Sequence, residues 1–133
     1  MNREIMYECL KEECKVAGCR NQRFRKREYA PLEVFHTPGK GYGLRCLRDL
    51  NEGDFVIEYC GEVIDAAEFK RRTTQYDTEG DEHFYFMTVG PDTVVDASRM
   101  SNLARFMNHS CEPNCSTQKW TVDGEVCNLI YTI

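Results

Sequence analysis

Short stretches of the chain alternate apolar and polar residues, and glycines or turn-forming pairs separate these stretches. Residues 32–37 run Leu, Glu, Val, Phe, His, Thr, which predicts a short strand. The same features predict further strands at residues 44–47, 55–60, 84–89, 93–95, 118–122 and 125–131. The last two flank Asp123-Gly124, a pair typical of a two-residue hairpin turn.

Two segments have the features of helices. Asp65 is followed three positions later by Glu68, which predicts a capped helix start and a helix that runs to about Tyr76. Residues 101–107 predict a second, short helix, and the three glycines of residues 39–43 predict a tight turn. With 133 residues, the chain is predicted to have a mostly β fold with short helices and several small sheets.

The first 30 residues differ from the rest of the chain. Residues 1–30 are polar and basic, and they contain Cys9, Cys14 and Cys19 with four residues between neighbours. Thiolates this close together can bind one tetrahedral zinc ion, although a structural site needs four ligands. Three unrelated cysteines in a basic segment remain the alternative. We therefore divide the chain into two domains. Residues 1–30 form a small irregular module that needs a metal or a cross-link for stability, and residues 31–133 form a second domain.

The charge of the chain is unevenly distributed. Residues 1–50 carry 11 basic and 7 acidic side chains, a net charge of +4, whereas residues 51–133 carry 6 and 15, a net charge of −9. An acidic body can attract a basic partner, and a basic end can contact phosphates. A merely solvated surface explains the same pattern.

Composition excludes several classes of protein. The 41% of hydrophobic residues argues against a disordered chain, and no apolar run reaches the ~18 residues of a membrane helix. The charges among residues 1–10 argue against a secretory signal, so reduced thiols are expected and a secreted disulfide domain is disfavoured.

Three further segments contain candidate functional residues. Glycines 39, 41 and 43 let the backbone approach a ligand, although a plain turn explains them equally. Residues 58–62 place a tyrosine at a strand end. Residues 104–115 combine Asn108, His109, Ser110 and Cys111, which leaves a Cys–His nucleophile or a hydrogen-bonded structural histidine open.

Taken in order, these segments resemble a SET-domain histone lysine methyltransferase from Cys9 to about Val126. The most specific stretch is residues 105–115, Arg-Phe-Met-Asn-His-Ser-Cys-Glu-Pro-Asn-Cys, with Thr-Gln-Lys-Trp behind it. Three shorter motifs precede it: Lys40-Gly41-Tyr42-Gly43-Leu44, Glu58-Tyr59-Cys60-Gly61-Glu62 and Phe84-Tyr85-Phe86. The cysteines with Asn21-Gln22-Arg23-Phe24 resemble the end of the AWS zinc module, which precedes SET in the group acting on lysine 36 of histone H3.

The resemblance implies S-adenosylmethionine as the methyl donor, structural zinc, and small sheets around a knot-like crossing near Asn108 and His109. It implies a donor site lined by Lys40, Gly41, Tyr42, His83, Phe84, Tyr85, Asn108 and His109. It implies a channel for the substrate lysine with Tyr59 and Tyr85, supported by Arg105 and Phe106. It implies zinc ligands Cys9, Cys14, Cys19 and, in a separate site, Cys111.

The resemblance also implies partners and a location. The expected partner is the histone H3 tail of a nucleosome in nuclear chromatin, and no membrane is expected. We further expect DNA phosphate contacts from a basic cluster, Arg20, Arg23, Arg25, Lys26 and Arg27.

The chain departs from the family after Val126. There the family continues into a segment with a second channel tyrosine, whereas this chain reads Cys127-Asn128-Leu129-Ile130-Tyr131-Thr132-Ile133. We expect a chain truncated at both ends and, on its own, a poor enzyme. Two alternatives stay open: a non-catalytic, zinc-dependent chromatin-binding relic of SET, and a hydrolase using Cys111 and His109.

Overall fold

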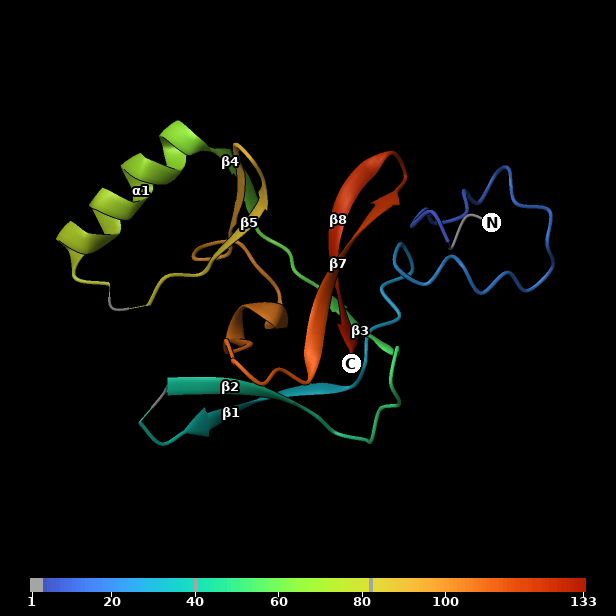
Figure 1. Ribbon diagram of the computed structural model, residues 1–133, viewed down its shortest axis with the longest axis horizontal. Helices are drawn as coiled ribbons and strands as arrows, with labels where there is room; N and C mark the ends of the chain where they lie inside the picture. Colours follow the sequence, from blue (N-terminus) through green and yellow to red (C-terminus); the bar gives the residue numbers. More distant parts are fainter. Residues whose placement is uncertain (1–3, 40, 82) are drawn as a thin grey trace. The chain divides into compact units, whose positions relative to one another are not determined.

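The strands of the protein form three small antiparallel sheets in the computed structural model, which describes residues 4–39, 41–81 and 83–133 (Figure 1). The strands, in chain order, are β1 Leu32–Thr37, β2 Gly41–Cys46, β3 Phe55–Glu58, β4 Glu62–Asp65, β5 Phe86–Gly90, β6 Thr93–Asp96, β7 Cys115–Val122 and β8 Glu125–Thr132. The sheet orders are β1-β2, β3-β8-β7 and β4-β6-β5. The predicted class, mostly β with several small sheets, is confirmed.

The chain divides into two compact units. The first unit contains residues 1–59 and 106–133, with the sheets β1-β2 and β3-β8-β7. The second unit contains residues 60–105, with the sheet β4-β6-β5 and the helix α1, Ala66–Glu79. Within residues 4–39, 41–81 and 83–133, no helix has the length and apolar character needed to cross a membrane.

Strands β7 and β8 form a long hairpin in the first unit. They pair along all eight residues of each strand, and Asp123 and Gly124 make the turn with φ angles of 50° and 85°. Positive φ at both turn positions matches the twist of the flanking strands. The predicted hairpin is confirmed, and its first strand begins three residues earlier than predicted, at Cys115 rather than Gln118.

Aromatic rings from distant parts of the sequence form the core of the first unit. The ring of Phe24 lies 4.9 Å from the rings of Phe55 and Trp120, in edge-to-face contact with both. The ring of Tyr131 on β8 lies 6.4 Å from that of Trp120 on β7. Such aromatic pairs add to the free energy of burial, and here they join the irregular N-terminal segment to the sheet β3-β8-β7.

Residues 4–30 contain turns and a single isolated bridge, so the expected irregular structure of this segment is confirmed. Tyr7 pairs in parallel with Thr121 of β7. The Thr121 N–H donates to the Met6 carbonyl and the Glu8 N–H donates to the Thr121 carbonyl, both at 2.9 Å. The buried Glu8 carboxylate accepts a hydrogen bond from the Phe24 N–H at 2.8 Å. The two Thr121 bonds fasten the segment to the edge of β7, and the Glu8–Phe24 bond joins two parts of the segment.

Helix α1 begins where the sequence predicts. The Asp65 carboxylate accepts a hydrogen bond from the Glu68 N–H at 2.8 Å, as expected of an N-cap. The helix ends three residues later than predicted, at Glu79 rather than Tyr76. Gly80 then adopts a φ of 79°, and the N–H groups of Gly80 and the next residue donate to carbonyls of the last helical turn. Glycine permits this left-handed cap, which sets the true end of the helix.

Residues 101–107 form less helix than predicted. The structure has one 3-10 turn there, η1, Leu103–Phe106. Asn102 caps this turn, because its side-chain oxygen accepts from the Ala104 N–H at 3.2 Å and its carbonyl accepts from the Arg105 N–H at 3.3 Å. The fully buried Ala104 then holds the turn in place by packing.

The glycines of residues 39–43 only partly form the predicted turn. Strand β2 begins at Gly41, which pairs with Thr37. A Cβ atom at Gly43 would lie 3.0 Å from Thr37 Oγ1 and 3.1 Å from the ring of Phe35. The third glycine therefore serves close strand packing and not a turn.

Strand β4 was not predicted. It pairs with β6 from Glu62 opposite Asp96 to Asp65 opposite Thr93. Only Ile64 of its four residues is buried, which is too short a pattern to predict a strand. The predicted hairpin around Gly90 is confirmed as β5 and β6, although β5 begins two residues later than predicted, at Phe86.

Candidate functional site

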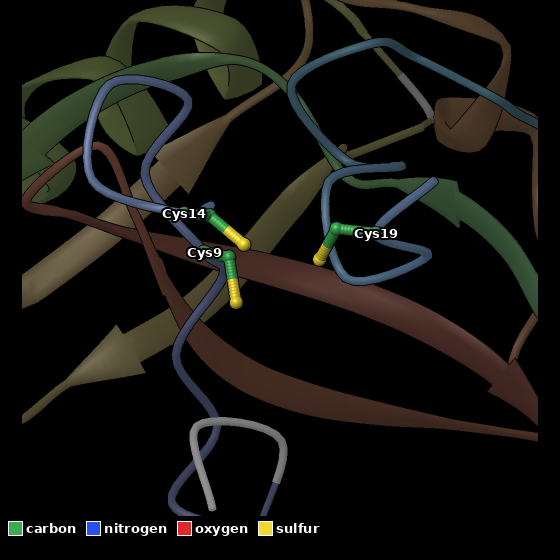
Figure 2. A group of neighbouring side chains, drawn as sticks. All are labelled: Cys9, Cys14 and Cys19. Carbon is green, nitrogen blue, oxygen red and sulfur yellow. The ribbon is translucent and has the colours of Figure 1, made fainter. Parts of the chain in front are cut away.

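The three N-terminal cysteines converge, as Figure 2 shows. The sulfur atoms of Cys9, Cys14 and Cys19 all lie within 4.8 Å of one another, and all three side chains are half-buried. Tetrahedral zinc with Zn–S bonds of about 2.3 Å needs sulfur atoms about 3.8 Å apart. The three thiols therefore lie close enough together to bind one zinc ion.

Asn21 supports this cysteine cluster. Its side-chain N–H donates to Cys9 Sγ at 3.3 Å and to the Tyr7 carbonyl at 2.8 Å. Its backbone carbonyl accepts from the Cys9 N–H at 2.9 Å. Hydrogen bonds to ligand sulfur orient thiolates around a metal. The sequence identified Asn21 only as part of a family motif, because an isolated asparagine carries no metal pattern.

The neighbouring thiols of the cluster disfavour ionisation of Cys19. The pKa of Cys19 is raised: a hydrogen bond with the backbone of Asn21 lowers it, but the neighbouring Cys14 and Cys9 thiols and burial raise it further. A bound cation favours the ionised thiolates that act as its ligands.

Cys111 does not belong to this cluster. Its side chain is exposed, and the cysteine cluster found among the described residues contains Cys9, Cys14 and Cys19 alone. Ser110 and Glu112 form a local turn around it, in which the Ser110 hydroxyl donates to the Glu112 carbonyl at 3.0 Å. Cys111 as a zinc ligand therefore stays a prediction.

Tyr42 is the centre of an aromatic cluster in the first unit. Its side chain is 58% exposed, and its ring lies 6.2 Å from the ring of Phe106 and 5.7 Å from that of His36, both edge to face. The Asn108 side-chain N–H donates to the Tyr42 carbonyl at 3.2 Å. Residues that lie 66 positions apart are thereby joined, and an aromatic surface is left open to a ligand.

This arrangement fits a cationic sulfonium ligand. Exposed aromatic faces attract cations, and Gly41, with a φ of 72°, leaves the backbone next to Tyr42 without a side chain. Asn108 and His109, which were also expected at the donor site, are both exposed. Lys40, expected at the same site, lies outside the described residues.

Tyr85 and Arg105 pair in the second unit. The guanidinium carbon of Arg105 lies 4.1 Å from the centre of the Tyr85 ring, a stacked cation–π contact. The Tyr85 carbonyl accepts a hydrogen bond from the Ala97 N–H at 2.8 Å. The prediction that Arg105 supports a channel tyrosine has this geometry in its favour.

His83 and Phe84 precede this tyrosine. Both side chains are exposed, and the ring of Phe84 stacks on that of Phe86 with centroids 6.2 Å apart. Exposed aromatic and imidazole groups remain accessible to a ligand, which is compatible with the expected role in donor binding.

Tyr59 is buried in the first unit, at the end of β3. Its N–H donates to the Asn128 carbonyl at 2.8 Å, which extends the pairing of β3 with β8 by one residue. Its backbone is therefore firmly held next to the sheet β3-β8-β7.

The predicted basic cluster contains two side chains that are engaged within the protein. Arg23 lies over the rings of Phe24, Phe55 and Tyr131 at 5.5, 5.6 and 5.9 Å. Arg25 forms an ion pair with Asp123 at 2.8 Å. The exposed members of the cluster are Arg20, Lys26 and Arg27.

The arrangement gives a Cys–His hydrolase no support. His109 and Cys111 are both exposed, and no hydrogen bond joins them in the part of the chain that the structure describes. A nucleophilic thiol needs a base within hydrogen-bond reach.

Two family models match successive parts of the chain. The chain matches the family model of the SET domain over residues 41–133 and that of the AWS domain over residues 1–27. The protein belongs to the SET domain family, with an AWS match in front of it.

Curated relatives cover nearly the whole chain. It is 48% identical over 134 residues to "Histone-lysine N-methyltransferase ASHH2" of Arabidopsis thaliana, across 100% of this chain and 8% of that protein. It is 48% identical over 126 residues to "Histone-lysine N-methyltransferase SETD2" of Homo sapiens, across 95% of this chain and 5% of that protein. It is 49% identical over 123 residues to "Histone-lysine N-methyltransferase, H3 lysine-36 specific" of Chaetomium globosum, across 92% of this chain and 14% of that protein. The chain thus spans less than a sixth of the length of each of these relatives.

Proposed function

We propose that this chain is the catalytic region of a protein-lysine methyltransferase that methylates lysine 36 of histone H3. The observation that carries the proposal is a contact between SET motif residues within each unit: Asn108 bonds to the backbone of the exposed Tyr42 in the first unit, and Arg105 lies over the Tyr85 ring in the second. The names of the relatives support the substrate class, because those proteins are called histone-lysine N-methyltransferases and some H3 lysine-36 specific. A nuclear, chromatin-bound role follows from that substrate.

S-adenosylmethionine, when bound, supplies a methyl group on a positively charged sulfur. We assign its binding to the cluster of Tyr42, Asn108 and His109, together with Gly41, Lys40, His83, Phe84 and Tyr85. The Tyr42 ring offers an aromatic face to the cation. The Asn108 amide fixes the Tyr42 backbone, which keeps that face in place.

The tyrosines Tyr59 and Tyr85 are assigned to the substrate lysine. A lysine amine with a pKa near 10.4 is protonated in water and cannot attack the methyl carbon. An apolar, aromatic channel favours the neutral amine, and tyrosine hydroxyls orient its lone pair. The rate then comes from alignment of donor and acceptor and not from a strong base. We assign Arg105 to the support of Tyr85, whose ring it lies over, and Phe106 to the support of the pocket beside Tyr42, whose ring it contacts edge to face.

Zinc would be held by Cys9, Cys14 and Cys19 and would act structurally. We also propose two domains, an AWS-like module in residues 1–30 and SET in residues 31–133, and Cys111 as a ligand of a separate zinc site. For DNA phosphates we retain the exposed Arg20, Lys26 and Arg27, since Arg23 and Arg25 contact groups within the protein.

The test uses the zinc-loaded chain, tritium-labelled S-adenosylmethionine and recombinant nucleosomes. The readout is label incorporated into histone H3 over hours. We expect label on H3, none on H3 with arginine at position 36, and a loss of at least about tenfold in Asn108→Ala, the size of an effect near 1.4 kcal/mol. The matched control is Ser110→Ala, an exposed neighbour outside the assigned site, which should keep its label.

Donor affinity separates the possible failures. Binding of S-adenosylmethionine without label on any histone would replace the proposal with the non-catalytic relic. Label that persists when position 36 is arginine would overturn the acceptor assignment. Absence of both binding and transfer would overturn the proposed activity altogether.

A further inference from the structure

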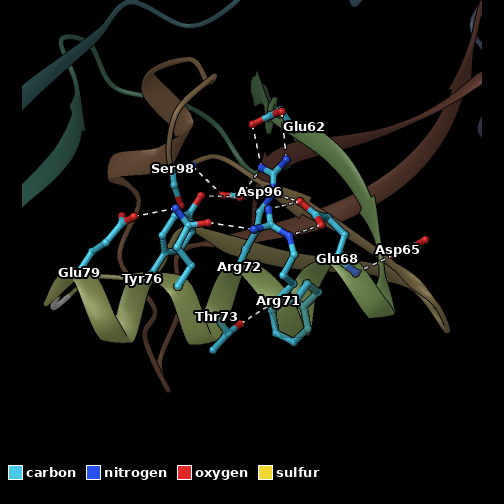
Figure 3. A network of polar contacts seen from close by, with 12 residues as sticks. Glu62, Asp65, Glu68, Arg71, Arg72, Thr73, Tyr76, Glu79, Asp96 and Ser98 are labelled. Atoms are coloured by element: carbon cyan, nitrogen blue, oxygen red, sulfur yellow. Dashed lines mark hydrogen bonds and ion pairs between the residues drawn. The ribbon is translucent and has the colours of Figure 1, made fainter.

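The carboxylate of Asp96 is completely buried and fully hydrogen-bonded in the second unit. Its exposed fraction is 0%. Its Oδ2 accepts from Arg72 Nη1 at 2.8 Å and from the Tyr76 hydroxyl at 3.1 Å, and its Oδ1 accepts from the Ser98 N–H at 2.9 Å. Figure 3 shows that Arg72 and Tyr76 reach Asp96 from one face of helix α1.

Arg72 joins three carboxylates at once. Its guanidinium lies 2.9 Å from Glu62, 2.8 Å from Glu68 and 2.8 Å from Asp96. The pKa of Asp96 is lowered: burial raises it, but the hydrogen bonds from Ser98, Arg72 and Tyr76 lower it further. The buried group is therefore an ionised carboxylate whose position depends on its partners.

The backbone next to Asp96 connects this network to Tyr85. Asp96 ends the central strand β6, opposite Glu62 on one side and Phe86 on the other. The following residue, Ala97, is fully buried and donates its N–H to the Tyr85 carbonyl at 2.8 Å. This hydrogen bond extends the pairing of β5 with β6 by one residue, from Phe86–Asp96 to Tyr85–Ala97.

The backbone of β6 at Val95 and Asp96 is tightly packed against Gly61. A Cβ atom at Gly61 would lie 2.5 Å from the Asp96 carbonyl oxygen and 2.7 Å from a methyl group of Val95. The chain therefore passes directly against β6 there, and a shift of Asp96 toward it would produce a clash. The carboxylate bonds limit movement in the other directions.

We propose that Asp96 is a positioning residue for Tyr85. Its carboxylate, held by Arg72 and Tyr76 of helix α1, fixes the Asp96–Ser98 turn, and the Ala97 N–H in that turn fixes the backbone from which the Tyr85 ring projects. This inference rests on the proposed function, in which Tyr85 orients the substrate amine. Helix α1 then acts on the reaction without touching either substrate.

The variants remove one contact at a time. Tyr76→Phe deletes only the hydroxyl that donates to Asp96, and Asp96→Asn removes the charge while keeping the shape. Arg71→Ala is the matched control, because Arg71 lies next to Arg72 on the same helix and binds Glu68 and Gln75 but not Asp96. Because Asp96→Asn leaves Arg72 partly unpaired and risks unfolding the protein, Tyr76→Phe decides the test.

Steady-state kinetics give the first readout. We expect kcat of Tyr76→Phe to fall by about threefold to tenfold, the effect of one hydrogen bond, with KM for the donor and the histone peptide within about twofold. Arg71→Ala should keep the kcat of the parent chain. A change in KM without a change in kcat would overturn the inference.

A double-mutant cycle with Tyr85→Phe separates positioning from general damage. If Asp96 acts through Tyr85, Tyr76→Phe should lower kcat much less in the Tyr85→Phe background than in the parent chain, since coupled residues are non-additive. Fully additive losses would overturn the inference while leaving the proposed function intact. If Tyr85→Phe itself had no effect, the role assigned to Tyr85 would be wrong.

Hydrogen exchange of the Ala97 amide tests the inference without any turnover. In Tyr76→Phe its exchange should quicken by at least about tenfold, and in Arg71→Ala it should not change. Unchanged exchange in Tyr76→Phe would overturn the inference even in an active protein. Faster exchange in a chain that transfers no methyl would support the geometric link and contradict only the proposed function.

Discussion

Arg105 stacks on Tyr85, with its guanidinium carbon 4.1 Å from the ring centre. A cation over an aromatic face holds that ring in place, and the ring carries the tyrosine hydroxyl. In the proposed mechanism this hydroxyl faces the substrate amine, which links the orientation of one arginine to the rate of transfer.

Replacement of Arg105 should therefore slow transfer. We expect Arg105→Leu to lower the initial rate of H3 methylation by roughly 3- to 30-fold, since a cation–π contact contributes about 0.5–2 kcal/mol. The rate of Arg105→Lys should lie between those of Arg105→Leu and the parent chain, because lysine keeps the charge and loses the planar guanidinium. Arg99→Lys, which changes an exposed arginine near Tyr76, is the control. Equal rates for Arg105→Leu and the parent chain would contradict the assignment.

Metal removal should destabilise the N-terminal segment. We expect elemental analysis to find zinc in the parent chain and about one equivalent less in Cys14→Ser, and we expect a lower melting temperature after chelation or in Cys14→Ser. A loss of only 1 kcal/mol shifts the melting temperature of a domain this size by about 4 °C. The control is Cys46→Ser, because Cys46 is a half-buried cysteine of β2 outside the cluster. This variant should bind as much zinc as the parent chain. Retention of zinc by Cys14→Ser would exclude Cys14 as a ligand.

The ion pairs of helix α1 should make stability depend on acid pH. The hydrogen bonds from Arg71 and Arg72 lower the pKa of Glu68 from 4.5 to about 2. The ionised form is thus favoured in the folded state, so its stabilising effect is present above pH 4.5 and is lost as the pH falls toward 2. Urea unfolding midpoints of the parent chain and Glu68→Gln should differ most above about pH 5 and converge only as the pH falls to about 2. A difference between the two midpoints that did not depend on pH would contradict the assignment of this effect to the Glu68 carboxylate. The control is Asp92→Asn, in the exposed turn between β5 and β6.

Nucleosome binding should depend on the exposed basic residues. Charge reversal in Lys26→Glu should weaken binding and reduce the slope of log affinity against log salt by about 0.9 for each phosphate that the protein no longer neutralises. Lys70→Glu, on the exposed side of α1, should leave the slope unchanged. If Lys26→Glu, Arg20→Glu and Arg27→Glu all kept the parent slope, DNA contact by this cluster would be excluded.

Local signals in the sequence predicted the elements whose structure is itself local. Asp123-Gly124 determines a turn by its own backbone preferences, Asp65 caps the helix that begins next to it, and three evenly spaced cysteines converge. Each of these features depends on residues that are close together in the sequence. The sequence therefore sufficed for the β7–β8 hairpin, for the start of α1 and for the candidate zinc site.

Features that depend on distant partners were missed. Arg25 was expected to contact DNA, but its ion-pair partner, Asp123, lies 98 positions away. Strand β4 was missed because its regularity comes from pairing with β6 and not from its own four residues. The role of Asp96 was invisible for the same reason, since its partner Arg72 lies 24 positions earlier on a different element.

The position of Phe24 in the core has a consequence for how the protein is made. Its ring packs against Trp120 and Tyr131, which a ribosome adds about a hundred residues later. The beginning of the chain must therefore wait, unburied, until the β7–β8 hairpin has been synthesised and can close over it. During that interval the nascent N-terminal segment exposes an aromatic side chain that the folded protein buries.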